Sequence, residues 1–430
     1  MEIEKLTEWN PWWENKEALN DLKGVKRTFY QDFIKSWEIK EISVVLGARR
    51  VGKSTLMYQM IDFLLEKGIS AEQILFVNLD DNKLSNNSLE EIYSAYRVNI
   101  NPGKKAFVFI DEIHRKEGWE SWIRKKYDLK SDCKFIISGS CSYLLKQEYS
   151  TLLTGRNLVF EIFPLSFQEY LDFNGIVINK NSLKKGIIRE KTKHQLLNYL
   201  KDYLETGGFP EIFFTKKGFK TKILKQYFDD ILYKDIISRH KINTKKIQDL
   251  ALFLITNVSD KFSLRNIRNT LKISYDSIKD YVSYFNEAYL FFINDYFSYS
   301  LKEQKSRASK IYCIDNGLRN SVSFKFSKDV GRLVENLVFI ELTRRGKDIY
   351  YWENNNEVDF VVKKNNKLDC INVCYSDEIP EREIKGLKEI KKDFGNKVKN
   401  LIVLTKDIEK EEDKIRFIPL WKWLILEDLV

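Results

Sequence analysis

Residues 47–54 of the chain read Gly-Ala-Arg-Arg-Val-Gly-Lys-Ser, a complete G-x-x-x-x-G-K-[ST] motif. Residues 42–46 before it form a β-branched run typical of a buried strand, and residues 54–65 after it have the apolar spacing of a helix. A chance match in a glycine-containing turn would not bring both flanking elements with it. The motif therefore predicts the strand, loop and helix of an α/β fold that binds the phosphates of a nucleotide.

Each side chain of this loop has an expected role. Gly47 and Gly52 permit the backbone angles that let successive N–H groups point at one phosphate. Lys53 is expected to reach the β- and γ-phosphates. The Ser54 hydroxyl is expected to complete the coordination shell of Mg²⁺.

A second apolar strand is predicted over residues 106–110, and Asp111 and Glu112 follow it. Asp111 can hold the water shell of Mg²⁺, and Glu112 can orient and polarise an attacking water. A carboxylate aimed at water favours hydrolysis of ATP over transfer to a hydroxyl group. A third strand, at residues 134–138, ends in Ser138, whose hydroxyl could contact the γ-phosphate, although Ser-Gly-Ser is also a common turn.

The order of these segments resembles the AAA+ ATPases, which are abundant in archaea and also found in bacteria. The similarity rests on residues 47–54, 107–112, 138–140, 153–156 and 164–170, with Asn10-Pro11-Trp12-Trp13 before them and Gly207-Gly208-Phe209-Pro210 after them. The resemblance implies a five-stranded parallel ATPase core followed by a helical lid, with ATP and Mg²⁺ bound. It also implies a homo-oligomer, either a ring or another assembly.

The resemblance implies two further roles. Arg156 stands where AAA+ proteins present an arginine finger to a neighbour's nucleotide, and Gly208 and Pro210 match a lid motif that lies against the adenine. An arginine on a solvated loop and a Gly-Gly-Phe-Pro helix stop are the structural alternatives. The catalytic candidates are Glu112, Lys53 and Arg156. The residues expected to bind ATP are Gly47, Ala48, Arg49, Arg50, Val51, Gly52, Lys53, Ser54, Thr55, Ser138, Gly208 and Pro210.

Residues 243–324 have the pattern of a winged helix. Three helices are expected at 247–258, 264–271 and 275–288, then a strand at 289–297, a polar basic loop at 302–310 and a returning strand at 311–314. The third helix is acidic, with Asp276, Asp280 and Glu287, which suits a DNA duplex poorly. The basic residues are Arg265, Arg268, Lys272, Lys302, Lys305, Arg307 and Lys310. Contact with DNA and packing against protein both stay open.

Residues 325–430 resemble the restriction-endonuclease-like domain often fused behind such ATPases. A helix opening at 331–336 carries Glu335, and a strand at 357–362 carries Asp359. On the next strand Asn372 and Cys374 stand where that domain has Glu and Lys. Asn can still offer a neutral oxygen to a metal, but Cys cannot replace the lysine. We therefore expect a degenerate nuclease site that does not cut DNA.

Composition limits the remaining choices. The chain has 430 residues and a net charge of +10, which permits polyanion binding without demonstrating it. It lacks an 18-residue apolar run and a signal-peptide pattern, so we expect a cytoplasmic protein without a membrane span. Its five cysteines show no C-x-x-C spacing, which argues against a structural zinc site and a disulfide scaffold.

The sequence predicts an N-terminal segment (1–25), an ATPase core (26–165), a helical lid (166–242), a winged helix (243–324) and the degenerate nuclease-like domain (325–430). Three functions compete. A DNA-associated motor or remodeller would hydrolyse ATP in response to nucleic acid, and a signalling or defence switch would change its binding of protein partners. An active ATP-dependent nuclease is the least favoured, because its catalytic residues are incomplete.

Overall fold

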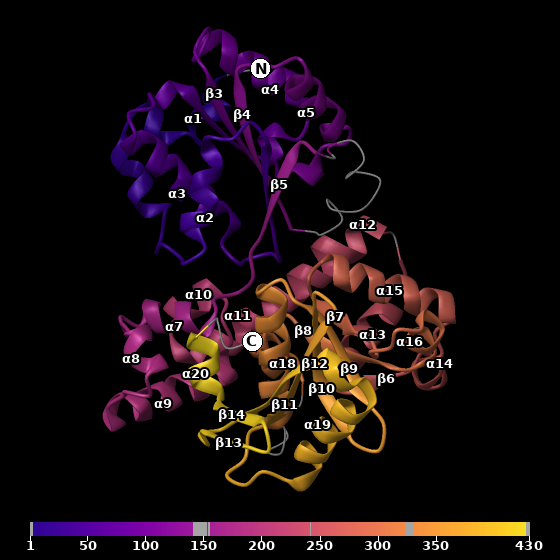
Figure 1. Cartoon of the computed structure of the whole chain (residues 1–430). Coiled ribbons are helices and arrows are strands. Elements are labelled where there is room, and N and C mark those ends of the chain that lie inside the picture. Colours follow the sequence, from indigo (N-terminus) through magenta and orange to yellow (C-terminus); the bar gives the residue numbers. More distant parts are fainter. Residues whose placement is uncertain (1–2, 141–152, 154, 241, 324–329, 427–430) are drawn as a thin grey trace. The chain divides into compact units, whose positions relative to one another are not determined.

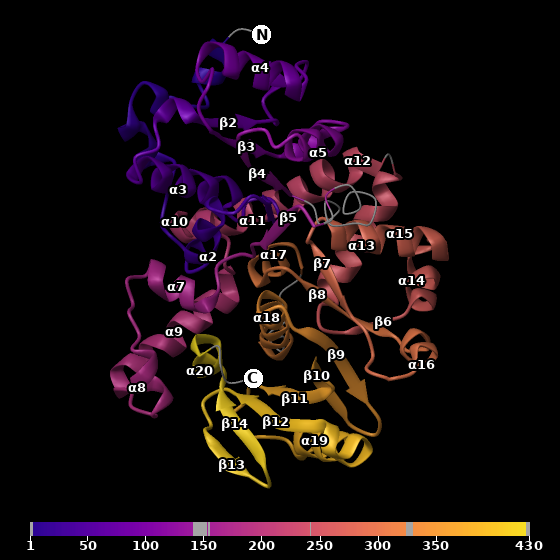
Figure 2. The same ribbon diagram turned by 45° about the horizontal axis from the view of Figure 1, so that its top comes forward.

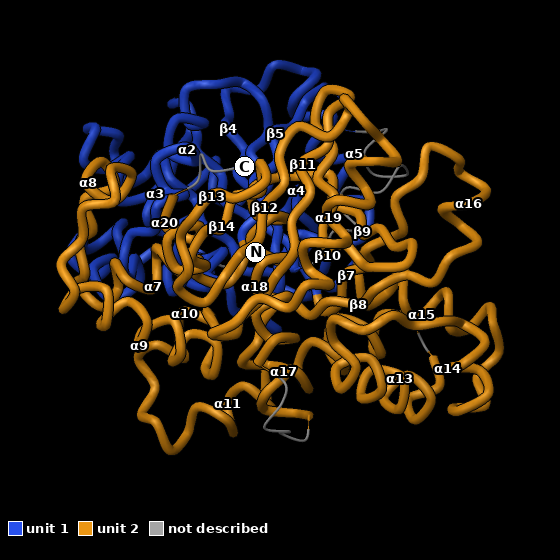
Figure 3. Tube along the Cα trace, turned by 60° about the horizontal axis from the view of Figure 1, so that its bottom comes forward, with its two compact units in different colours: residues 1–162, 287–289 blue, residues 163–286, 290–430 orange. Residues whose placement is uncertain are grey.

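The computed structural model describes residues 3–140, 153, 155–240, 242–323 and 330–426, and Figures 1 and 2 show it from two directions. The chain divides into two compact units, coloured separately in Figure 3. The first contains residues 1–162 and 287–289, and the second contains residues 163–286 and 290–430. Each unit has its own sheets and its own buried core.

The first unit is built on a parallel five-stranded sheet in the order β2-β3-β4-β1-β5. The strands are β1 (Ile42–Leu46), β2 (Ile74–Asn78), β3 (Ala106–Asp111), β4 (Cys133–Gly139) and β5 (Asn157–Glu161). The four strands β1 to β4 are apolar and buried along nearly their whole length, as parallel strands covered on both faces must be. The predicted α/β fold with a five-stranded parallel core is confirmed.

Short and medium helices precede and connect these strands. They are α1 (Glu4–Thr7), α2 (Tyr30–Ile34), α3 (Lys53–Glu66), α4 (Leu89–Asn99) and α5 (Trp119–Asp128). The start of α4 is fixed by a capping box, in which the Ser88 side chain accepts from the Glu91 backbone N–H and the Glu91 carboxylate accepts from that of Ser88. The first predicted helix, at 54–65, corresponds to α3.

The N-terminal segment covers the edge strand β2. The Asn10 side-chain amide donates to the Phe76 carbonyl oxygen at 2.8 Å and accepts from the Phe76 N–H at 2.6 Å, as a neighbouring strand would. The Trp13 indole N–H donates to the Ile74 carbonyl oxygen at 2.9 Å. An open strand edge is a template for unwanted pairing, so these contacts give the Asn-Pro-Trp-Trp sequence a structural purpose.

The second unit begins with helices and ends with a mixed sheet. Its helices are α7 (Phe167–Phe173), α8 (Lys180–Lys184), α9 (Glu190–Thr206), α10 (Pro210–Phe214), α11 (Lys217–Asp230), α12 (Ser238–His240), α13 (Thr244–Thr256), α14 (Leu264–Leu271), α15 (Tyr275–Glu287), α16 (Leu301–Ser306), α17 (Asn316–Val322), α18 (Val330–Arg344), α19 (Glu381–Phe394) and α20 (Leu420–Ile425). A π-helical stretch, Ile231–Ile237, joins α11 to α12. Among the helices of the described ranges, none combines the length and apolar character needed to cross a membrane.

A small antiparallel sheet in the order β6-β8-β7 follows helix α13. Its strands are β6 (Lys261–Phe262), β7 (Phe291–Asn294) and β8 (Ser309–Cys313). The three helices expected here are present as α13, α14 and α15. The expected polar loop at 302–310 is wrong, because residues 301–306 form α16, whose start is capped by Ser300.

The C-terminal sheet has six strands in the order β13-β14-β12-β11-β10-β9. The strands are β9 (Asp348–Glu353), β10 (Glu357–Lys364), β11 (Lys367–Cys374), β12 (Val398–Thr405), β13 (Lys410–Glu412) and β14 (Ile415–Pro419). The pairs β11–β12 and β12–β14 are parallel, and the others are antiparallel. Two of the strands expected from the sequence, at 357–362 and 368–374, correspond to β10 and β11.

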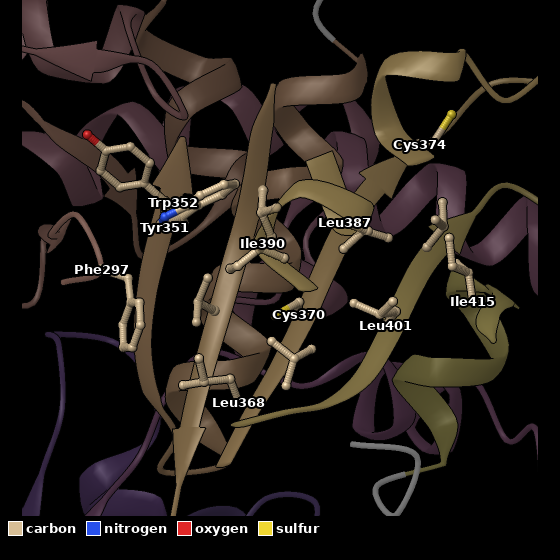
Figure 4. Packing of buried hydrophobic residues seen from close by; sticks show 14 of the residues in the cluster. Phe297, Tyr351, Trp352, Leu368, Cys370, Cys374, Leu387, Ile390, Leu401 and Ile415 are labelled. Carbon is tan, nitrogen blue, oxygen red and sulfur yellow. The ribbon is translucent and has the colours of Figure 1, made fainter. Parts of the chain in front are cut away.

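The two faces of this sheet are covered by different helices. Leu387 and Ile390 of α19 join a buried cluster with Val361 and Cys370 on one face, as Figure 4 shows for Leu387, Ile390 and Cys370. Because side chains alternate along a strand, Phe360 of β10 points to the opposite face, where its ring lies 6.4 Å from that of Phe339 in α18. Helix α18 therefore packs against β10 from the side opposite α19.

Candidate nucleotide-binding site

The phosphate-loop motif forms a tight turn between β1 and α3. Gly47 has φ 150°, and a Cβ atom there would lie 2.1 Å from the Ile162 carbonyl oxygen. Gly52 has φ 98° and immediately precedes α3, whose first residue is Lys53. Arg50 also has a positive φ, 70°. Only a glycine fits at the first of these positions, so the spacing of the motif follows from the backbone path.

Lys53 folds back over this loop. Its side chain is 4% exposed, and Nζ donates to the carbonyl oxygens of Gly47 at 3.1 Å and Ala48 at 3.0 Å. The ammonium also lies 3.7 Å from Oε1 of Glu112. The loop thus holds its one lysine at the N-terminus of α3, where a phosphate gains both the ammonium and the helix dipole.

The carboxyl ends of three neighbouring strands bring Ser54, Asp111 and Ser138 together. The Ser54 hydroxyl, after β1, donates to Asp111 Oδ2 at 2.5 Å. The Ser138 hydroxyl of β4 donates to Asp111 Oδ1 and accepts from the Glu112 backbone N–H at 3.1 Å. Parallel strands end at a common edge, so residues 84 positions apart in the chain form one cluster.

Asp111 is buried, and the desolvation this imposes, together with the neighbouring charge of Glu112, raises its pKa. The hydroxyl groups of Ser138 and Ser54 and the Lys53 ammonium act in the opposite direction. A buried carboxylate beside a serine hydroxyl is a set of hard oxygen donors, and a divalent cation would supply the positive charge that it lacks. The residues present therefore fit Mg²⁺.

Glu112 is held in a strained position. Its backbone has φ 55°, in the left-handed region that glutamate seldom adopts. Its Oε2 is buried and accepts no hydrogen bond from any residue in the described part of the chain, although His114 Nδ1 lies 3.4 Å away. A buried carboxylate oxygen in this state has a lone pair to offer to a water molecule.

The sequence reasoning overlooked Asp80, which follows β2 at the same edge of the sheet. Arg115 Nε donates to Asp80 Oδ1 at 2.6 Å, and Arg49 of the phosphate loop donates to Oδ2 at 3.3 Å. Although burial raises the pKa of Asp80, the two guanidinium groups lower it overall. The available signal was an acidic residue just beyond the end of a strand. Of the other loop positions, Ala48 and Val51 are buried and Thr55 lies in the first turn of α3.

Arg156 lies at the other end of the sheet. It immediately precedes β5, and its carbonyl oxygen accepts from the N–H of Ile42, the first residue of β1, at 2.8 Å. The phosphate loop follows the last residue of β1, on the order of 15 Å further along the strand. The Arg156 guanidinium donates to Asp128 Oδ1 at 2.9 Å. The chain therefore does not bring Arg156 to its own phosphate loop. The family resemblance also implies a helix between the third predicted strand and Arg156, and residues 141–152 and 154 of that segment lie outside the described residues.

Gly208 and Pro210, the predicted adenine contacts, belong to the second unit. The Gly208 N–H donates to Asp315 Oδ2 at 2.7 Å, and its carbonyl oxygen accepts from the Leu165 N–H at 2.6 Å. Pro210 begins helix α10. Their structural role is visible within that unit, and their contact with adenine stays a prediction. Asp315, which anchors this segment, was not singled out from the sequence.

Glu335 and Asp359 of the nuclease-like region are brought together around a lysine. Lys310 Nζ lies 2.8 Å from Glu335 Oε1 and 3.4 Å from Asp359 Oδ1, and its side chain is 3% exposed. Lys310 was expected among the basic residues of a wing, and this is wrong because the residue is buried in ion pairs. Because Lys310 is far in the sequence from Glu335 and Asp359, no local motif indicates that it lies between them.

Asn372 and Cys374 both lie on β11, and both side chains make hydrogen bonds within the unit. Asn372 Oδ1 accepts from the Asp359 N–H at 3.0 Å, and its Nδ2 donates to the carbonyl oxygens of Glu357 and Glu383. The hydrogen bond from Asp359 uses one lone pair of the Asn372 oxygen, and binding of that oxygen to a metal stays a prediction. Cys374 is buried in the core cluster under α19, and burial raises the pKa of its thiol.

A match to a known protein family agrees with the fold of the first unit. A family described as "AAA domain" matches residues 40–171. Two families described only as domains of unknown function, DUF8612 and DUF4143, match residues 197–329 and 330–423. Among solved structures, the Walker-type ATPase paby2304 of Pyrococcus abyssi is 13% identical and has a TM-score of 0.43, covering 69% of this chain and 95% of that one.

Two uncharacterised proteins are similar over nearly the whole chain. A protein of Haemophilus influenzae is 29% identical over 413 residues, covering 93% of this chain and 98% of its own length. The protein MJ1544 of Methanocaldococcus jannaschii is 36% identical over 405 residues, covering 89% of this chain and 88% of its own length. The first unit has the AAA-type P-loop ATPase fold, and the chain as a whole belongs to the same family as MJ1544.

Proposed function

We propose that the first unit binds ATP with Mg²⁺ and hydrolyses it to ADP and phosphate. The observation that carries this proposal is the cluster of Ser54, Asp111, Ser138 and Glu112 at the same sheet edge as the phosphate loop. A loop that only held phosphate would have no use for two buried carboxylates, because both repel an anion. Their presence is explained by a cation on one and a water molecule on the other.

The residues divide the chemistry among themselves. Ser54 and Asp111 would hold Mg²⁺, which supplies positive charge to the phosphate oxygens. Lys53 stabilises the charge that develops on the γ-phosphoryl group. Glu112 orients the attacking water and accepts its proton as the bond from the γ-phosphorus to the ADP oxygen breaks. The Ser138 hydroxyl positions both acidic residues, because it donates to the Asp111 carboxylate and accepts from the Glu112 backbone N–H.

We propose further that the protein acts in the cytoplasm as a homo-oligomeric, DNA-associated motor or remodeller. The net charge of +10 supports contact with a polyanion. The order of helices and strands from α13 to β8 supports a winged helix. Exposed basic residues remain on it after Lys310 is set aside: Arg265, Arg268, Lys272, Lys302, Lys305 and Arg307. Predicted contacts of Gly208 and Pro210 with adenine belong to this proposal.

A nucleotide-dependent switch with protein partners is the second candidate. Helix α15 supports it, since the exposed Asp276 and Asp280 would repel a duplex in the major groove. An active nuclease has less support, because Asn372 and Cys374 replace the expected catalytic pair and are engaged in other contacts.

Turnover of ATP by the full chain, measured alone and with single-stranded, duplex or branched DNA, distinguishes these candidates. A motor or remodeller should hydrolyse ATP several times faster with at least one of these DNAs, and the stimulation should fall as salt rises. Slow turnover that no DNA changes would favour the switch. Nicked or cut DNA that appears with the wild type and not with Asp359→Ala would favour the nuclease.

A further inference from the structure

Lys310 is a buried lysine at the centre of a cluster of charged side chains in the second unit. It belongs to β8, and its ammonium contacts the carboxylates of Glu335 on α18 and of Glu357 and Asp359 on β10. The distances to Glu335 Oε1 and Asp359 Oδ1 are 2.8 and 3.4 Å. One ammonium thus joins three carboxylates from two other elements of the same unit.

The carboxylates have additional donors. The Tyr312 hydroxyl donates to Glu335 Oε1 at 2.7 Å, and the Val373 backbone N–H donates to Asp359 Oδ2 at 2.9 Å. Glu357 Oε2 lies 2.5 Å from Nζ of a second lysine, Lys261. Each carboxylate therefore keeps a partner of its own besides Lys310.

The charges of the cluster nearly balance. Three partly buried carboxylates without a cation would be destabilising, because partial desolvation and mutual repulsion act together. Lys310 and Lys261 supply two positive charges, as one divalent ion would. Although burial lowers the pKa of Lys310, the nearby carboxylates, Glu335 first among them, raise it well above its usual range. Lys310 is thus a permanent cation.

The cluster is accessible from solvent. It lies in the wall of a cleft of about 730 Å³ that is lined by Lys310, Glu335, Glu357 and Asp359 together with Lys261 and Arg382. The side chains of Glu335 and Asp359 are each 15% exposed, and that of Glu357 is 31% exposed. A metal ion in solution can therefore reach these carboxylates, and access alone does not keep it away.

We propose that Lys310 is the built-in cation of this centre: its ammonium occupies the position that a divalent metal would take among Glu335, Glu357 and Asp359, and so excludes the metal. Lys310 also ties β8 to β10 and α18. These ion pairs block metal binding, and the cluster then has a structural role in the unit. This proposal is independent of nucleotide hydrolysis in the first unit.

Binding of Mn²⁺ to the nucleotide-free full chain, followed by electron paramagnetic resonance, tests the proposal. The wild type and Asp359→Asn should bind Mn²⁺ identically, since neither has a metal at this centre. Lys310→Ala should gain one site at least tenfold tighter than any background binding, and adding Asp359→Asn should remove it. Lys305→Ala is the matched control, because the Lys305 side chain is exposed and its ammonium lies 3.6 Å from Asp295 Oδ2.

Two results would overturn the proposal. The first is a Mn²⁺ site in the wild type that Asp359→Asn removes, because metal and Lys310 would then coexist. The second is a folded Lys310→Ala protein, shown by an unchanged circular dichroism spectrum, that gains no site. Should Lys310→Ala fail to fold, Lys310→Met keeps the buried volume and is measured instead, with the same two results overturning the proposal.

Discussion

Lys53 Nζ and Glu112 Oε1 lie 3.7 Å apart, yet we expect the two side chains to have different roles at the phosphate site. The ammonium attracts phosphate in the ground state and in the transition state alike. The carboxylate repels phosphate and is useful only when a water molecule attacks. Proximity in the fold therefore does not imply that the two substitutions have the same effect.

Lys53→Ala should weaken ATP binding about 10- to 100-fold, because it removes a charge-assisted contact from a buried site. Glu112→Gln should keep ATP binding and lower kcat by about 100-fold or more. Fluorescent-nucleotide titration and phosphate release measure the two effects. Lys67→Ala, at the far end of α3 and over the Phe63 ring, is the charge-matched control and should change neither. Equal loss of binding in both variants would refute the assigned roles.

Site residues could be predicted from the sequence where a local motif indicates which groups lie near them. Lys53, Ser54 and Asp111 could be predicted because a phosphate loop and the end of a parallel strand must share an edge. Lys310 and Asp315 could not, because each is defined by contacts with residues far away in the chain, whereas Asp80 had a signal in its place just beyond the end of a strand. Lys310 shows the limit best, since a lysine in a basic stretch indicates an exposed residue until its three carboxylates are known.

At the scale of elements, β1, β3 and β4 could be predicted because their apolar runs are buried, and α3 because helical apolar spacing follows the phosphate loop. The segment at 301–306 could not. Its polar sequence suits a loop, and only the Ser300 cap and the Glu303 backbone N–H bonded to it mark the start of a helix. The Gly207–Pro210 segment was expected to be either an adenine contact or a helix stop, and the structure shows how closely it packs.

Gly208→Ala should destabilise the second unit. The added Cβ would lie 2.5 Å from the Leu165 carbonyl oxygen, which belongs to the backbone and cannot move aside easily. Overpacking of this kind costs about 1–3 kcal/mol. Gly218→Ala is the matched control, because Gly218 is exposed in α11 with open space around it and alanine favours a helix. Thermal unfolding should separate the two variants, and equal melting temperatures would contradict the close packing at Gly208.

The same segment should respond to pH through Asp315. Burial raises the pKa of Asp315 to about 6. The hydrogen bonds from the Gly208 and Leu318 N–H groups and the positive charge of Arg344 lower this pKa, but by less than burial raises it. A carboxyl group whose pKa is higher in the folded state stabilises that state fully below about pH 4, and the stabilisation is lost as pH rises through 6. Between pH 5 and 7.5 the local loss should be on the order of 1 kcal/mol.

Hydrogen exchange, corrected for its intrinsic pH dependence, measures this loss at the Gly208 and Leu318 amides. In Asp315→Asn the slope between pH 5 and 7.5 should be flatter, because the amide does not titrate. Protection that rises with pH in the wild type, or slopes that are equal in the two proteins, would contradict the prediction.

At the scale of the whole molecule, Arg156 poses the main question. Within one chain it lies at the amino end of the sheet, and the phosphate loop lies at the carboxyl end. A finger role is therefore compatible with the fold only if a second copy supplies the arginine. Such a head-to-tail contact uses two different faces of the subunit, as ring assemblies do.

Arg156→Ala should abolish most ATP hydrolysis while leaving ATP binding intact, because the finger acts on the transition state. Arg124→Ala is the matched control, since Arg124 pairs with the same carboxylate, Asp128, at 3.4 Å and is expected to leave turnover unchanged. Mixing Arg156→Ala with Lys53→Ala subunits should restore activity. At equal amounts, roughly a quarter of the interfaces would pair an intact pocket with an intact finger. No recovery at any ratio, in a preparation shown to exchange subunits, would mean that Arg156 has a structural role within its own chain, such as its ion pair with Asp128.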